Sequence, residues 1–164
     1  MTDYLKAALK AALEAGAAIL EIYHSGDFDV TVKGDDSPLT RADLASHEVI
    51  VSHLGGTNIP ILSEEGRGIP FDERKDWRQL WIVDPIDGTK EFIKRNGEFT
   101  VNLALVEEGV PVLGVIFVPA TGEMYYSDRE SGAFKVESMG SMEDQTSAQK
   151  LPLNVEGRPF TVVA

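Results

Sequence analysis

The sequence WIVDPIDGTKEF, residues 81–92, is an apolar run that ends in two acids placed three residues apart. Residues 80–84 are apolar up to Asp84, which is typical of a strand buried within a sheet. The charges of Asp84 and Asp87 repel each other unless a positive charge lies between them. We therefore expect a divalent metal ion at the end of this strand, or a phosphate ester bound through one.

The residues that follow Asp84 predict a site for an anion. Pro85 fixes the backbone so that both carboxylates can turn to one side, with the carbonyl of Ile86 nearby. Gly88 permits close approach, and the amides of Gly88 and Thr89 would begin a short helical turn. Unpaired amides at such a start bind anions readily. A metal ion on one side and backbone amides on the other would together bind a phosphate group.

Two further acidic positions support this interpretation. Glu64 and Glu65 end the short strand-like stretch 60–65, and Asp43 lies early in a predicted helix. Oxygen ligands of this kind suit Mg²⁺, Mn²⁺ or Ca²⁺ rather than zinc. Simpler explanations stay open, because Asp-x-x-Asp-Gly is also an ordinary turn sequence. Asp43, three residues after Thr40, also fits a helix capping box.

Other sites are excluded by spacing. Haloacid-dehalogenase phosphatases carry Asp-x-Asp-Gly-Thr after a hydrophobic strand, whereas the acids here are three residues apart. An EF-hand needs ligands two and four positions beyond Asp84, where Ile86 and Gly88 stand. No two of the 3 histidines are spaced as a metal pair or matched to a nucleophilic serine, so no serine triad is predicted.

Composition limits the classes of partner. The 164 residues correspond to one ordinary domain, and 15 basic against 27 acidic side chains give a formal charge of −12. That balance argues against nucleic acid as a main partner. The sequence has no cysteine, which rules out thiolate metal sites, and no apolar stretch that approaches the ~18 residues of a membrane span.

The hydrophobic pattern predicts an α+β fold, with two helices packed on a largely antiparallel sheet. We expect helices at 3–24 and from Thr40 to about residue 54, and strands at 28–33, 60–65 and 80–84. A meander follows at 100–107, 110–119 and 123–127, with a further strand at 132–136, a loop at 138–150 and an extended piece at 151–155. Gly16 costs the first helix roughly 1 kcal/mol relative to alanine, which is tolerable if something packs closely there. RPFTVVA (158–164) stops as if inside a buried strand, so we expect a fragment.

These motifs resemble a known family. LSEE (62–65) followed by WIVDPIDGT (81–89) is similar to the metal-dependent, lithium-sensitive phosphatases that include inositol monophosphatase and fructose-1,6-bisphosphatase. Within this family, DGTKEFIKRNGEFTVNLALVE (87–107) resembles the CysQ-type 3'(2'),5'-bisphosphate nucleotidases. The resemblance extends from the first helix through DDSPLTRAD (35–43) to the end. It implies that residues 1–157 form the N-terminal metal- and phosphate-binding half of a layered fold. Residues 158–164 would begin a C-terminal α/β domain that is absent.

The resemblance implies a set of metal ligands. Glu64, Asp84 and the Ile86 carbonyl would bind one Mg²⁺, whose bound water is the nucleophile. Asp84 would bridge to a second Mg²⁺ shared with Asp87, and such metal pairs catalyse in-line phosphoryl displacement. Glu64, Ile86 and Asp87 would also border the substrate. Two or three Mg²⁺ ions are implied, with Mn²⁺ as a substitute and Li⁺ as an inhibitor.

It also implies catalytic and substrate-binding residues. Thr89, oriented by Asp43, would aim or deprotonate the water, and Glu65 would support the site from outside the set of metal ligands or through a water molecule. The amides of Gly88 and Thr89 would hold the phosphate, and Lys33 would neutralise substrate charge. The C-terminal domain of the family carries another metal-binding aspartate and much of the substrate-recognition surface, so we expect impaired activity.

The implied reaction is Mg²⁺-dependent hydrolysis of 3'-phosphoadenosine 5'-phosphate to AMP and phosphate, which clears a by-product of sulfate assimilation. The implied location is the cytoplasm or the cytoplasmic face of the inner membrane, without insertion into it. One alternative is an inositol- or sugar-phosphate phosphatase of the same family. The other is an inactive fragment that binds metal or self-associates.

Overall fold

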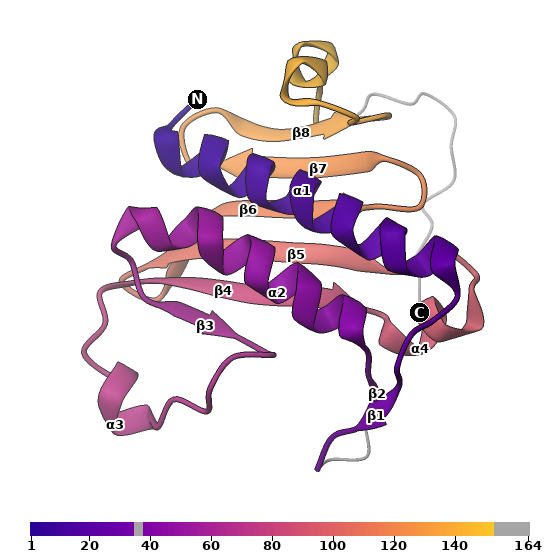
Figure 1. Ribbon diagram of the computed structural model, residues 1–164. Helices are drawn as coiled ribbons and strands as arrows, with labels where there is room; N and C mark the ends of the chain where they lie inside the picture. Colours follow the sequence, from indigo (N-terminus) through magenta and orange to yellow (C-terminus); the bar gives the residue numbers. More distant parts are fainter. Residues whose placement is uncertain (35–37, 153–164) are drawn as a thin grey trace.

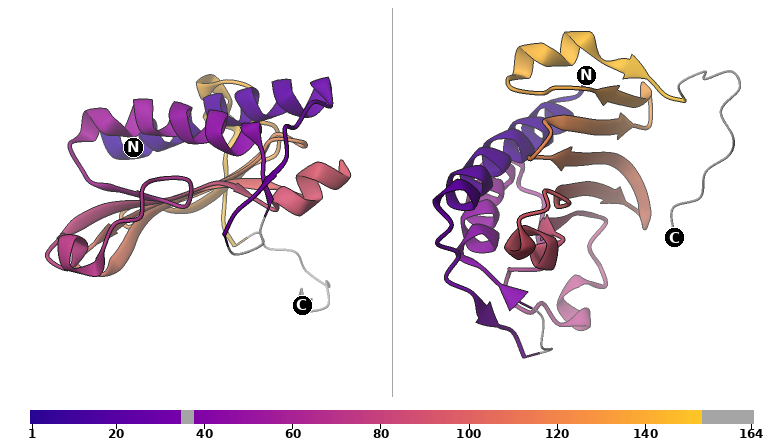
Figure 2. Two further views of the ribbon diagram at one scale, coloured as in Figure 1. Left: turned by 60° about the horizontal axis from the view of Figure 1, so that its bottom comes forward. Right: turned by 90° about the vertical axis from the view of Figure 1, so that its right-hand side faces the viewer.

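The computed structural model describes residues 1–34 and 38–152 as two layers, with two long helices lying across one face of a seven-stranded sheet (Figure 1). Turning the molecule shows both helices in one layer above the sheet (Figure 2). This arrangement confirms the predicted α+β class. The predicted boundary at 157/158, the segment 158–164 and residues 153–155 of the extended piece lie outside the described residues.

The two long helices have the termini that their sequences predict. Helix α1 (Asp3–Ser25) begins after Thr2, whose Oγ1 accepts a hydrogen bond from the Leu5 amide at 3.2 Å, and it ends at the left-handed Gly26. Helix α2 (Arg41–Leu54) begins with a complete capping box formed by Thr40 and Asp43. The capping function predicted for Asp43 is thus confirmed.

Neighbouring strands of the sheet are also consecutive in the chain, from β3 at one edge to β9 at the other. Among the described strands only β3 and β4 are parallel, and every later pair is antiparallel. The strands are β3 (Ile61–Ser63), β4 (Gln79–Asp87), β5 (Thr100–Glu107), β6 (Val110–Val118), β7 (Glu123–Asp128), β8 (Gly132–Val136) and β9 (Gln149–Lys150).

Four sequence predictions need correction. The expected strand 60–65 is shorter in the structure, where β3 ends at Ser63. The expected strand 28–33 shrinks to β1 (Thr31–Val32), which pairs only with β2 (Pro38–Leu39), because its exposed residues have no larger sheet to join. The expected loop 138–150 contains a 3₁₀ helix (Met142–Ser147) and β9. Strand β4 runs to Asp87, beyond the expected end at 84. The remaining short elements are α3 (Phe71–Arg74), α4 (Thr89–Lys94) and a 3₁₀ turn (Gly55–Thr57).

The core fills the space between the helices and the sheet. Trp81 and Val101 are fully buried on the helix side, whereas Ile82 and Ile116 are nearly half exposed on the opposite side. A β-carbon at Gly16 would overlap the ring of Phe117 on β6, so glycine is what lets α1 approach the sheet. Along the described residues, no helix is long and apolar enough to cross a membrane.

The close approach at Gly16 predicts a cost for the smallest added side chain. We expect Gly16→Ala to lose about 1–2 kcal/mol of unfolding free energy, because crowding against Phe117 outweighs the gain of ~1 kcal/mol in helix propensity. Gly55→Ala is the control, since Gly55 has right-handed helical angles and open space around its α-carbon. Urea unfolding measures both, and equal stability of the two variants would contradict the packing.

Candidate active site

A one-residue bulge brings Asp84 and Asp87 to the same face of the sheet. Side chains three apart in a regular strand point to opposite faces. Here Asp84 pairs with Asn102 and Asp87 pairs with Thr100. A step of three residues along β4 therefore matches a step of two residues along β5. Cross-strand partners share a face, and the bulge at Pro85–Ile86 therefore aligns the two carboxylates.

The parallel pairing of β3 and β4 adds Glu64 to this group. Ser63 is in register with Val83, and the amide of Glu64 donates to the Val83 carbonyl at 3.1 Å. Glu64 thus leaves β3 beside Asp84. The two carboxylates are close enough for the negative charge of Glu64 to contribute to the raised pKa of Asp84. The structure therefore gathers acids that are twenty residues apart in the chain.

Asp84 lacks a partner for one of its oxygens. Its Oδ1 is buried without a hydrogen bond among the described residues, which is costly for a carboxylate. Burial, followed by the negative charges of Glu64 and Asp87, raises the pKa of Asp84 to about 7. A group in this situation needs a cation or a proton.

Asp43 joins the start of α2 to the start of α4. Its Oδ2 accepts from the amide of Thr40 at 2.8 Å, and its Oδ1 accepts from Thr89 Oγ1 at 3.1 Å. Asp43 is only 1% exposed, so solvent does not compete for these bonds. The capping and the Thr89 contact use different oxygens, and one carboxylate therefore satisfies both.

Two polar contacts that the sequence did not reveal also position the acids. Ser46 Oγ donates to the Pro85 carbonyl at 2.8 Å and ties α2 to the bulge. Asn102 Nδ2 donates to Asp87 Oδ2 at 3.3 Å. An asparagine within the apolar strand TVNLALVE was the available signal for the second contact. Nothing local in the sequence pointed to the first.

Gly88 connects the bulge to α4 with a conformation that needs glycine. Its φ is +96°, and a β-carbon there would lie 2.7 Å from the Glu98 carbonyl oxygen. Glycine is therefore what lets this backbone pass close to that of Glu98 and Phe99, whereas the approach of an anion to Gly88 stays a prediction. Helix α4 begins with Thr89, so the short helical turn expected after Gly88 is confirmed.

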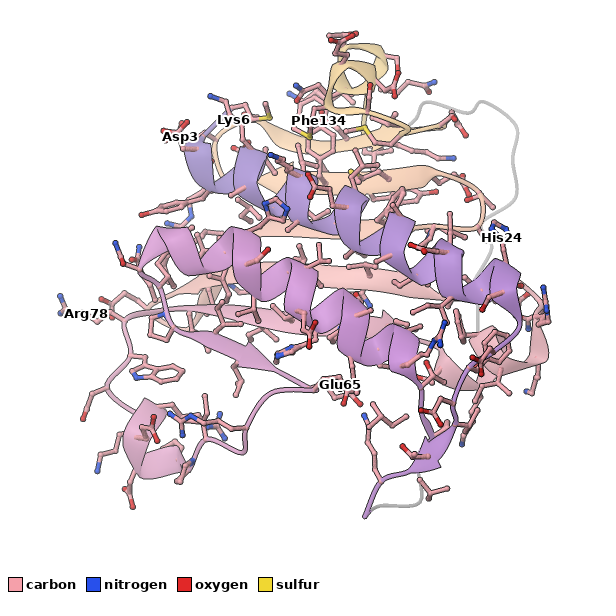
Figure 3. All side chains as sticks on the ribbon, in the orientation of Figure 1. Asp3, Lys6, His24, Glu65, Arg78 and Phe134 are labelled. Carbon is pink, nitrogen blue, oxygen red and sulfur yellow. The ribbon has the colours of Figure 1, made fainter. Side chains whose placement is uncertain are left out.

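Lys33 lies between two of the predicted site acids. Its Nζ is 2.9 Å from Glu64 Oε1 and 2.5 Å from Glu65 Oε1. Figure 3 shows Glu65 where β3 ends, facing the segment that carries β1 and β2. Burial lowers the pKa of Lys33, but the hydrogen bonds to Glu65 and Glu64 outweigh it and raise the pKa above the usual lysine value.

The donor set fits a hard divalent cation. All the candidate ligand atoms are carboxylate or carbonyl oxygens, and Asp84 Oδ1 is buried without a partner. Within residues 1–34 and 38–152, however, no three acidic or histidine side chains converge closely enough to enclose an ion as they lie. Glu64 is held by Lys33 and must turn toward Asp84 to complete such a group. The ligand roles of Glu64, Asp84, Ile86 and Asp87 stay predictions.

The structure pairs one histidine with a serine, which the sequence spacing did not suggest. His47 Nδ1 on α2 is 2.8 Å from Ser63 Oγ at the end of β3. Across the part of the chain that the structure describes, no carboxylate hydrogen-bonds to His47, so the pair lacks the third member of a triad. It links α2 to the strand that carries Glu64.

Comparison with known proteins places this fold and site in one family. The inositol monophosphatase family matches residues 1–158. The chain belongs to the inositol monophosphatase family of phosphatases.

The relatives and solved structures that match the chain include several CysQ proteins. It is 46% identical to the 3'(2'),5'-bisphosphate nucleotidase CysQ of Salmonella typhimurium, over 92% of this chain and 61% of that protein. It is 45% identical to CysQ of Escherichia coli K12, over 90% and 60%. The crystal structure of CysQ from Bacteroides thetaiotaomicron superposes with a TM-score of 0.83 at 46% identity, covering 95% of this chain and 59% of that one. The chain thus spans about three fifths of the length of these relatives.

The raised pKa of Asp84 predicts how stability depends on pH without metal. The folded protein keeps this proton up to about pH 7, whereas an unfolded aspartate loses it near pH ~4. The metal-free protein therefore loses stability as pH rises between these values. At pH 8 we expect Asp84→Asn to exceed the wild type by about 1–2 kcal/mol, after discounting for solvent screening.

Urea unfolding in EDTA at pH 4.5 and pH 8 measures this difference. Asp76→Asn, at an exposed acid outside the site, should show no gain that depends on pH. An Asp84→Asn variant that is less stable than the wild type at pH 8 would contradict the electrostatic assignment.

Proposed function

We propose that this chain provides the metal- and phosphate-binding part of a Mg²⁺-dependent phosphomonoesterase. Its substrate would be 3'-phosphoadenosine 5'-phosphate, and the products would be AMP and inorganic phosphate. The buried, unpartnered Asp84 oxygen among Glu64 and Asp87 is the observation that carries the metal-dependent chemistry. The similarity to proteins named 3'(2'),5'-bisphosphate nucleotidase supports the substrate.

The proposed metal ligands are Glu64, Asp84, the Ile86 carbonyl and Asp87. Two or three Mg²⁺ ions bound there would lower the pKa of water and stabilise the leaving oxygen, with Mn²⁺ as a substitute and Li⁺ as an inhibitor. The bulge is the feature of the chain that suits this role, because it holds Asp84 and Asp87 on one face.

The chain's own residues would orient the nucleophile and the substrate. When Thr89 Oγ1 donates its proton to Asp43, its lone pairs stay free to accept a hydrogen bond from water. Glu65 would act indirectly, since its buried carboxylate anchors Lys33. The amides of Gly88 and Thr89 are the proposed phosphate contacts, in the backbone geometry that the positive φ of Gly88 allows.

The finer parts of the proposal concern substrate, partners and location. A small phosphorylated nucleotide is the proposed partner, with no nucleic acid. The proposed location is the cytoplasm. The alternative is peripheral attachment to the inner membrane, and cell fractionation distinguishes the two. An inositol- or sugar-phosphate phosphatase is the second candidate, favoured by a structural match to an IMPase of Thermotoga maritima with a TM-score of 0.72 at 30% identity. A self-associating, inactive metal binder is the third.

Phosphate release tests the reaction directly. With 3'-phosphoadenosine 5'-phosphate we expect release that requires Mg²⁺ and falls by about 10²-fold or more in Asp87→Asn, because loss of a metal ligand exceeds the usual effect of an outer contact. Asp72→Asn, an exposed acid outside the site, should match the wild type. Release that persists in EDTA, or that survives Asp87→Asn, would contradict the proposal. Faster release from inositol 1-phosphate favours the second candidate, and Mg²⁺ binding without release favours the third.

A second capping box supplies a control for Asp43. Asp144 caps the 3₁₀ helix with Ser141 in the same way, but it is exposed and far from the acids in sequence. We expect both Asp43→Asn and Asp144→Asn to lose stability, because each carboxylate accepts capping hydrogen bonds. For the buried Asp43 the loss is about 1–2 kcal/mol. Only Asp43→Asn should also slow Mg²⁺-dependent phosphate release, by about 10- to 100-fold, because Thr89 loses its carboxylate acceptor. Its hydroxyl then keeps only the Ile86 carbonyl, 3.3 Å away, as an acceptor among the described residues. Equal phosphate release rates in the two variants would show that Asp43 only caps helix α2.

A further inference from the structure

Lys33 provides a positive charge to one part of the acidic cluster. Its ammonium contacts Glu64 and Glu65 at 2.9 and 2.5 Å. Asp84, next to Glu64, has a buried oxygen that finds no hydrogen-bond partner among residues 1–34 and 38–152. The acids are therefore only partly neutralised. The ammonium of Lys33 contacts Glu64 and Glu65, whereas the carboxylate with the unpaired buried oxygen is that of Asp84.

The two glutamates differ in their freedom to move. The side chain of Glu65 is 7% exposed, and that of Lys33 is 20% exposed, so this pair is largely withdrawn from water. The side chain of Glu64 is 51% exposed and can rotate at little cost. A change in the charge of the site should therefore move Glu64 and leave the Lys33–Glu65 pair in place.

We propose that Lys33 is a tethered counter-ion that holds Glu64 in the metal-free protein and gives it up when a divalent cation binds beside Asp84. This inference rests on the metal site of the proposed function. In the exchange Glu64 turns from Lys33 to the cation, and Lys33 keeps Glu65. An ammonium has three N–H donors, so the exchange frees a donor that faces the site. A phosphate dianion arriving on the metal is the ligand that this donor suits.

The direction of the effect on metal affinity separates this role from simple positioning. If Lys33 only positioned Glu64, its removal would weaken Mg²⁺ binding, by about 10- to 100-fold as for other outer contacts. If Lys33 competes with the cation, its removal strengthens Mg²⁺ binding. A lysine charge a few ångströms from the ion repels it, and we expect a gain of about tenfold.

Lys135 provides a matched control. Its Nζ also lies between two glutamates, 2.7 Å from Glu123 and 3.0 Å from Glu137, and its side chain is 14% exposed. These residues belong to β7, β8 and the residue after β8, outside the candidate site. Lys135→Met thus breaks the same kind of contact without touching the metal ligands.

Isothermal titration with Mg²⁺ at pH 8 tests the exchange in the wild type, Lys33→Met and Lys135→Met. We expect about tenfold tighter Mg²⁺ binding in Lys33→Met, unchanged binding in Lys135→Met, and a lower melting temperature for both without metal. Inorganic phosphate titrated in the presence of Mg²⁺ should bind more weakly to Lys33→Met than to the wild type. Unchanged or weaker Mg²⁺ binding in Lys33→Met overturns the exchange while leaving the metal site intact.

Absence of Mg²⁺ binding in all three proteins refutes the metal site, and the exchange with it. Lys33→Met leaves the buried carboxylate of Glu65 without its ion-pair partner, which destabilises the fold. A comparison within the Glu65→Gln background removes this negative charge and separates metal affinity from folding. Lys33→Met combined with Glu65→Gln should bind Mg²⁺ more tightly than Glu65→Gln alone, and equal affinities overturn the exchange.

Discussion

The bulge between Asp84 and Asp87 is the constraint on which the site depends. Without the extra residue, the alternation of β4 would point one carboxylate into the layer beneath the helices and the other to the open face. With it, both acids lie on one face opposite Thr100 and Asn102. The parallel neighbour β3 then delivers Glu64 to the same place. The cost of the arrangement appears as the raised pKa of Asp84, which is caused first by burial and then by repulsion from Glu64 and Asp87.

Hydrogen bonds tie helix α2 to the bulge and to the start of helix α4. Ser46 on α2 holds the Pro85 carbonyl, and Asp43 at the start of α2 holds the hydroxyl of Thr89 at the start of α4. Helix α2 is itself fixed by its capping box and by its packing against α1 and β4. The same carboxylate thus stabilises a helix and orients a side chain at the site. In the proposed function, Asp43 would therefore serve both stability and chemistry, whereas the charge proposed for Asp84 opposes stability.

The sequence predicted the elements with strong local signals and missed the contacts that depend on the assembled fold. Helices α1 and α2 and the meander from Thr100 follow from apolar periodicity and turn residues. The strand expected at 28–33 had suitable residues, but only Thr31 and Val32 pair, and they pair with the two residues of β2 outside the seven-stranded sheet. The 3₁₀ helix after Ser141 was overlooked although Ser141 and Asp144 form a capping pattern. The bulge, the Ser46 contact and the pairing of Lys33 with both glutamates join segments distant in sequence, which local patterns do not encode.

Metal location is the most direct test of the central claim that the bulge creates a divalent cation site. A crystal of this chain grown with Mn²⁺ would show the ion by its anomalous scattering. We predict a peak about 2.0–2.2 Å from Asp84 Oδ1, with Asp87 and Glu64 turned toward it and Lys33 retained by Glu65. A peak confined to other acids, such as Glu107 and Glu108, or no peak beside Asp84, would contradict the account.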